Sequence, residues 1–141
     1  MAVTNFDEYR DVYVVADTID DVVHPVTYEL IGQARRIAKE LGQLVQVMLL
    51  GENVQAEAEE LVAHGADIVH VFESPLLKYY TTDGYTKVLT DFFEDHKPNI
   101  LLIGATNNGR DLAPRMSGRM QNGVVADCTI LTVDTEEGLV E

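Results

Sequence analysis

The chain has 141 residues, of which 46% are hydrophobic, so it is long enough to bury the core of one domain. Ten basic residues face 24 acidic ones, which gives a formal net charge of −14. A field of this sign repels phosphate backbones and anionic lipid, so we expect neither nucleic acid nor a membrane surface as a partner. The acid excess has two interpretations: solubility, or a docking face for a basic partner.

No stretch approaches the ~20 consecutive apolar residues of a membrane span, so membrane insertion is not expected. The first ten residues lack the basic and apolar regions of a secretory signal. The single cysteine, Cys128, excludes an internal disulfide and suits a reducing compartment. Together these features favour a cytoplasmic location.

Four short apolar runs predict buried strands. They are Val12–Ala16, Leu44–Leu50, Ile68–Phe72 and Leu101–Ile103, the last preceded by Ile100. Each run is continuous rather than alternating, which indicates burial on both faces and therefore a parallel sheet covered by helices.

Three amphipathic segments between these runs predict helices. The first begins after Pro25, which suits a first turn, and ends at Gly42, which suits a left-handed cap. The second is capped by Asn53 and buries an apolar stripe that includes Val62. The third ends before Pro98.

The last part of the chain follows a different pattern. After a turn at 122–123, Thr129–Val133 alternates polar and apolar residues, as a half-exposed strand does, and a second turn precedes Leu139. The whole order predicts one α/β domain with three layers, a mostly parallel Rossmann-like sheet and a closing hairpin. Because the second hairpin strand has barely begun at Glu141, we expect a fragment of a longer polypeptide.

The most specific segment is 101–115, where an apolar strand runs into a glycine-punctuated turn and then a helix. Such a corner lies at the carboxyl end of a parallel sheet, where open α/β folds place ligands and partners. We expect the helix to begin near Asp111 as its N-cap and to run to about Met120. Pro114 is then expected in the first turn, because a deeper proline costs about 3 kcal/mol.

Motifs for chemistry are mostly absent. Gly104 and Gly109 copy the glycine spacing of a Walker A loop, but Arg110 and Asp111 stand where that loop needs lysine and a hydroxyl. No dinucleotide fingerprint occurs, and no two of the four histidines have the i, i+4 spacing of a helical metal pair. We therefore predict no catalytic residue, no metal ligand and no cofactor-binding residue in this chain.

The charged residues of the corner have two interpretations. In one, Asp111, Arg115 and Arg119 form an i, i+4 ladder along the helix, while Gly118 lets the helix lie close to the sheet. In the other, Arg110, Asp111, Arg115 and Arg119 are interface residues that pair with another domain or subunit. Arginine favours such interfaces because its planar fork binds both oxygens of a carboxylate.

The string Gly109–Arg115, with Ile103–Thr106 before it and Ala126–Thr129 after it, closely resembles the alpha subunit of electron transfer flavoprotein. Thr27–Arg35 resembles the first helix of that family, and the likeness covers nearly the whole chain. Val125 departs from it, because threonine or serine is common there.

This resemblance implies an N-terminal α/β domain related to adenine-nucleotide-hydrolase-like folds, followed beyond residue 141 by a domain that holds FAD. It implies a heterodimer with a beta subunit, which houses an AMP or a second FAD, and electron exchange with acyl-CoA or other dehydrogenases. No cofactor is then expected on residues 1–141.

Three functions follow as hypotheses. The first is a scaffold domain of an electron carrier, without enzymatic activity of its own. The alternative is a free-standing adenine-nucleotide-binding module of the same fold. The third is a small enzyme acting at the corner formed by residues 111–115, which lacks a nucleophile, a metal cluster and a base.

Overall fold

The computed structural model describes residues 10–96, 98–104, 106–121, 129–134 and 139–140. The strands are β1 (Val12–Val15), β2 (Thr18–Ile19), β3 (Val22–Val23), β4 (Val45–Gly51), β5 (Ile68–Glu73), β6 (Ile100–Gly104), β7 (Thr129–Asp134) and β8 (Leu139–Val140). The helices are α1 (Val26–Leu41), α2 (Gln55–Ala63), the short 3-10 helix η2 (Pro75–Leu77), α3 (Thr82–Asp95) and α4 (Asn107–Gln121).

The main sheet has six strands in the order β5-β4-β1-β6-β7-β8. All neighbours are parallel except β7 and β8, which pair antiparallel, so the predicted mostly parallel sheet and closing hairpin are confirmed. The strand order reverses at β1, which puts the topological switch point between β1 and β6. The turns expected at 122–123 and 136–138, and Cys128, lie outside the described residues.

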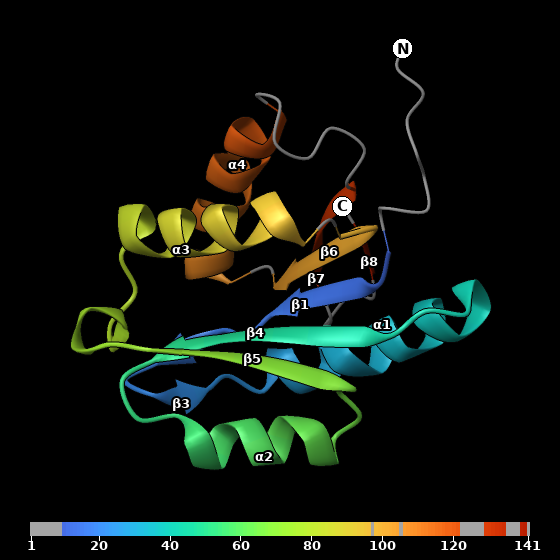
Figure 1. Cartoon of the computed structure of the whole chain (residues 1–141), viewed down its shortest axis with the longest axis horizontal. Coiled ribbons are helices and arrows are strands. Elements are labelled where there is room, and N and C mark those ends of the chain that lie inside the picture. Colours follow the sequence, from blue (N-terminus) through green and yellow to red (C-terminus); the bar gives the residue numbers. More distant parts are fainter. Residues whose placement is uncertain (1–9, 97, 105, 122–128, 135–138, 141) are drawn as a thin grey trace.

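Helices cover both faces of the sheet, with α1 and α2 on one side and α3 and α4 on the other (Figure 1). Val12 and Val14 of β1 enter the core under α1, whereas Tyr13 and Val15 enter the core under α3 and α4. The continuous apolar strands thus serve two cores at once. None of the described helices is both long and apolar enough to cross a lipid bilayer.

Two expectations about burial are wrong. The edge strand β5 is only partly buried despite its continuous apolar run, because it has a neighbour on one side only. Val62 was expected in the buried stripe of α2, yet 52% of it is exposed, and Leu61 alone is fully buried in that helix. A short helix over an edge strand covers little area, so few of its side chains reach the core.

The start of α2 also differs from the expectation. The N-cap residue is Val54, not Asn53, and the Val54 side chain makes no capping hydrogen bond. Instead, the Glu73 carboxylate at the end of β5 accepts from the Val54 amide at 3.0 Å. The Asn53 amide donates to the carboxylate of Asp21, in the β2–β3 turn, at 3.1 Å. Two acids that are distant in sequence therefore cap the amino-terminal end of α2, a role that the local pattern assigned to Asn53.

The start of α4 corrects a further expectation. The helix begins at Asn107, four residues before Asp111, and the Thr106 hydroxyl accepts from the Gly109 amide at 3.1 Å as an N-cap does. Pro114 consequently lies inside the helix rather than in its first turn. The sequence offered two good caps, and the structure uses the earlier one.

Gly109 sets how closely α4 approaches the sheet. A Cβ atom at this position would lie 1.8 Å from the carbonyl oxygen of Gly104, a distance that no side chain can tolerate. A Cβ at Gly118 would meet nothing within 4 Å, so the expectation that Gly118 permits close packing is wrong. The helix touches the sheet at its amino-terminal end.

We predict opposite effects for alanine at these two glycines. Gly109→Ala should lower the free energy of unfolding by at least ~2 kcal/mol, because a backbone clash cannot be relieved by a rotamer change. Gly118→Ala should raise it by about 0.5–1 kcal/mol, because alanine favours an exposed helix position. Urea unfolding of both variants checks this, and equal effects would contradict the assigned contact.

Candidate functional site

The carboxyl ends of β1 and β6 frame a small crevice at the switch point of the sheet. Asp17, Thr18, Tyr80, Gly104 and Gly109 belong to its walls. Its volume is about 20 Å³, which is room for about one water molecule. The crevice therefore lies where α/β folds hold ligands, but it is nearly filled by the protein itself.

A wider groove adjoins this crevice on the outside. It has a volume of about 390 Å³ and is lined by Asp17, Ile19, His24 and the first residues of α4, from Thr106 to Asn108. The groove runs between the β2–β3 hairpin and the amino-terminal end of α4. It is open to solvent, and no lysine or arginine is among its lining residues.

Asp17 closes the amino-terminal end of α4. The Thr106 hydroxyl donates a short hydrogen bond to the Asp17 carboxylate and accepts from the Gly109 amide. The Asp17 amide in turn donates to the Thr27 hydroxyl of α1 at 3.0 Å. The first turn of a helix favours a negative charge, and here an internal carboxylate supplies it.

Asp111 lies one turn further along α4 and faces the segment before α3. The Tyr80 hydroxyl donates to one Asp111 oxygen at 2.7 Å, and the Thr82 hydroxyl donates to the same oxygen. These two donors hold the pKa of Asp111 below its ordinary value. Burial of the ring, with the Asp111 carboxylate adding to it, raises the pKa of Tyr80 to about 12.

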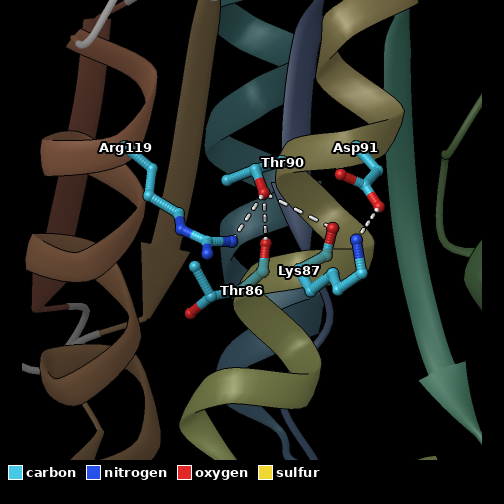
Figure 2. A network of polar contacts seen from close by, with 5 residues as sticks. All are labelled: Thr86, Lys87, Thr90, Asp91 and Arg119. Atoms are coloured by element: carbon cyan, nitrogen blue, oxygen red, sulfur yellow. Dashed lines mark hydrogen bonds and ion pairs between the residues drawn. The ribbon is translucent and has the colours of Figure 1, made fainter.

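Arg115 and Arg119 also reach towards α3. Arg115 pairs with Asp83 at 3.4 Å, in an exposed ion pair, and Arg119 donates to the Thr90 hydroxyl at 3.5 Å (Figure 2). The ladder along α4 stays a prediction. After the hydrogen bonds from Thr82 and Tyr80, the Arg115 charge also lowers the pKa of Asp111. The hydrogen bonds and the ion pair that the structure describes for these side chains go to α3 and the segment before it. The i, i+4 spacing does mark a common face, but that face binds the neighbouring helix.

The Thr90 hydroxyl accepts the hydrogen bond from Arg119 and donates its own to the Thr86 carbonyl at 2.7 Å (Figure 2). The buried Thr86 hydroxyl has no hydrogen-bond partner within the described part of the chain. The hydrogen bond from Arg119 to Thr90 is thus long, and the nearby Thr86 hydroxyl is unsatisfied among the described residues. The apolar residues Leu89, Phe93 and Met116 hold α3 and α4 in the same core.

Arg110 differs from the other three interface candidates. Its side chain is exposed, and among the described residues it has no hydrogen bond or ion pair. Its backbone amide donates to the Thr106 carbonyl at 2.8 Å, which fixes it in the first turn of α4. Of the four candidates, Arg110 alone is left available to a partner by the contacts within this domain.

The sequence analysis missed Asp17, Thr106 and Tyr80 as members of this corner. A signal for Asp17 exists, because it is the first acid after a buried strand at the carboxyl edge of a parallel sheet. Tyr80 has none, since its contact with Asp111 spans 31 residues. Within the described residues, no group of three or more histidine, cysteine or acidic side chains could hold a metal ion.

The sequence pattern of the electron transfer flavoprotein domain matches residues 12–141, nearly the whole chain. The chain belongs to the electron transfer flavoprotein family. It is 45% identical over 130 residues to an electron transfer flavoprotein alpha subunit from Megasphaera elsdenii, which covers 92% of this chain and 38% of that relative.

A second relative carries the name of an enzyme complex. It is the LctC subunit of a lactate dehydrogenase (NAD(+),ferredoxin) from Acetobacterium woodii, 45% identical over 133 residues. These residues make up 94% of this chain and 32% of the relative. The chain therefore spans 38% and 32% of the lengths of these two curated relatives.

Among solved structures, the universal stress protein from Archaeoglobus fulgidus has a similar fold. The TM-score is 0.55, the identity is 15%, and the match covers 88% of this chain and 97% of that one. At this identity the likeness shows the Rossmann-like fold alone.

The small crevice at the corner is not itself a flavin or nucleotide pocket, and the wider groove beside it has no lysine or arginine among its lining residues. A crevice of about 20 Å³ is too small for an adenine or isoalloxazine ring. The Asp17 carboxylate already lies at the amino-terminal end of α4, where it would repel a phosphate group. The hydrogen bonds at this corner position α4 against the end of β1 and against the segment before α3.

We predict that Asp111→Asn lowers the free energy of unfolding at pH 7, because the amide is a weaker acceptor than the carboxylate for Tyr80 and Thr82. A lowered folded-state pKa stabilises the fold above the ordinary value of 3.8, and this stabilisation is lost as pH falls below it. The difference between wild type and variant should therefore shrink on acidification.

Urea unfolding between pH 7 and pH 3 measures this difference. Asp95→Asn, at an exposed acid near the end of α3, is the matched control. If the two variants are equally stable throughout that range, Asp111 has no anchoring role.

Proposed function

We propose that this chain is the N-terminal scaffold domain of an electron transfer flavoprotein alpha subunit. In this proposal it is part of an electron carrier, holds other parts of the assembly in place and catalyses nothing alone. The proposal is supported most by one observation: the electron transfer flavoprotein domain matches residues 12–141, nearly the whole chain.

The proposal assigns the redox group to another part of the assembly. FAD is held outside residues 1–141, in the C-terminal domain of the alpha subunit, and the beta subunit contains an AMP or a second FAD. The partners are that beta subunit and acyl-CoA or other dehydrogenases, in the cytoplasm. The match to about a third of each relative's length supports a division of this kind.

Arg110 is the side chain that we assign to an intersubunit or interdomain ion pair. Asp111, Arg115 and Arg119 already bind groups on α3 or just before it, so their part is to fix α4. An exposed arginine on a helix whose first turn is tightly fixed offers a partner carboxylate a pre-positioned fork.

A free-standing adenine-nucleotide module is the alternative function. The universal stress protein with a similar fold was solved in complex with dAMP, which supports the idea at the level of architecture. The small crevice and the Asp17 carboxylate speak against it in this chain.

We predict that purified residues 1–141 are colourless and bind neither AMP nor ATP. The reason is that the Asp17 carboxylate lies at the amino-terminal end of α4 and no lysine or arginine lines the groove beside it, so a phosphate group finds no counter-charge there. Absorbance near 450 nm and isothermal titration calorimetry at about millimolar ligand measure this. A stoichiometric flavin spectrum would refute the scaffold assignment, and heat from AMP would favour the nucleotide module.

We also predict that the chain binds an electron transfer flavoprotein beta subunit, and that Arg110→Ala weakens this binding about tenfold. Arg36→Ala is the matched control, because Arg36 is an exposed arginine on α1 with no partner among the described side chains. Both variants should keep the free energy of unfolding within ~0.5 kcal/mol of wild type. Equal binding by the two variants would remove Arg110 from the interface.

A further inference from the structure

The most exposed apolar side chains of the described residues gather at one place. Leu76, Val22, Tyr79 and Ile19 are 83%, 65%, 61% and 60% exposed, more than any other large apolar side chain described. Ile19 and Val22 lie on the β2–β3 hairpin, which follows the carboxyl end of β1. Leu76 and Tyr79 lie in and just after η2, which follows the carboxyl end of β5. We call these four residues the carboxyl-edge patch.

The two halves of the carboxyl-edge patch are neighbours. Ile19 and Val22 are cross-strand partners, so they share one face of the hairpin. Asp20, at the tip of the hairpin, pairs with Lys78 at 3.6 Å, and Lys78 stands between Leu76 and Tyr79 in the sequence. Scattered exposed apolar residues need no explanation, but four that adjoin at one ion pair indicate an interaction site.

Buried hydrogen bonds fix η2 and the β2–β3 hairpin, the two segments that carry the patch. The buried Tyr85 hydroxyl donates to the Leu77 carbonyl at 2.9 Å and lies 3.4 Å from the Thr18 hydroxyl. That Thr18 hydroxyl, at the base of the hairpin, donates to the Leu50 carbonyl of β4 at 3.1 Å. One tyrosine thus supports both η2 and the hairpin.

The tip of the hairpin is fixed as well. Asp20 and Asp21 have φ values of 52° and 64°, the left-handed conformation of a two-residue hairpin turn. The Asp21 carboxylate accepts from the Glu52 amide at 2.8 Å and from the Asn53 amide at 3.1 Å. A two-stranded hairpin is marginal alone, so these bonds keep Ile19 and Val22 exposed in one conformation. Such pre-organisation lowers the entropic cost of binding.

The charges around the patch are mostly negative. Asp20 and Glu52 lie near Lys78, whose pKa is raised by the nearby Tyr79, Asp20 and Glu52, and Asp21 accepts from the Glu52 amide. An apolar centre with an acidic rim fits a partner surface with an apolar centre and a rim of lysine and arginine. It fits a second copy of this chain poorly, because the same acids would meet.

We propose that the carboxyl-edge patch is the surface through which this domain docks onto its partner subunit, at an apolar area bordered by basic residues. The inference rests on the proposed function, because the occupant is the second subunit of the flavoprotein. It deepens that function by separating two contacts. The patch supplies the apolar area, while Arg110, in the first turn of α4, supplies an ion pair.

The test measures binding of the full chain to a purified electron transfer flavoprotein beta subunit by calorimetry. Two independent double variants remove the apolar groups: Leu76→Ser with Tyr79→Ser, and Ile19→Thr with Val22→Thr, which keeps the β-branched shape. The control is Leu41→Ser with Leu44→Ser, two side chains 45% and 46% exposed at the opposite edge of the sheet. We expect each patch variant to bind at least tenfold more weakly and the control to bind within twofold of wild type.

Each possible result supports or overturns the docking assignment. If wild type binds and both patch variants, folded by circular dichroism, bind equally well, the docking assignment is overturned while the proposed function stands. If wild type does not bind, both are overturned. If sedimentation shows that wild type forms a dimer that the patch variants lose, the patch belongs to a second copy, and the assignment to a basic partner falls.

A second arm tests the charge of the rim. Glu52→Lys should lower the association rate constant several-fold at low salt, and Glu40→Lys, at the far end of α1, should lower it less for the same change in net charge. Stopped-flow measurements at low and high salt give both rates. Equal effects would show that net charge alone steers the association, and would overturn the acidic rim as a docking determinant.

Discussion

The close contact between α4 and the end of β6 constrains the rest of this corner. Gly109 lies so near the Gly104 carbonyl that only a hydrogen atom fits between them. This approach brings Thr106 to Asp17 and puts Leu112 and Met116 into the core under α3. Neither the hydrogen bond nor the apolar contacts could form if a side chain held the helix further out.

The position of α4 divides its charged side chains into two groups. Asp111, Arg115 and Arg119 recur every four residues and face α3 and the segment before it, where they bind Tyr80, Asp83 and Thr90 respectively. Exposed pairs of this kind contribute little each, so their effect is to fix the rotation of the helix about its axis. That rotation is what leaves Arg110 facing solvent.

The strands, their parallel order and the closing hairpin could be predicted because burial on two faces leaves a continuous apolar pattern. The start of α4 could not, since Asp111 and Pro114 imitate a helix start and Thr106 is an equally good cap. The contacts between helices could not be predicted either. The spacing of Asp111, Arg115 and Arg119 shows that they share one face of α4, but it does not show which element packs against that face. The β2–β3 hairpin has strands of two residues, too short for any periodic signal.

Asp17 also affects how the domain responds to its surroundings. A protein that binds a ligand only when folded gains stability in proportion to the logarithm of ligand concentration, so its abundance follows metabolite levels. Here the counter-charge for α4 is part of the polypeptide and is always present at full occupancy. The first turn of α4 therefore has its counter-charge without a bound anion, whatever the concentration of small anions around the protein.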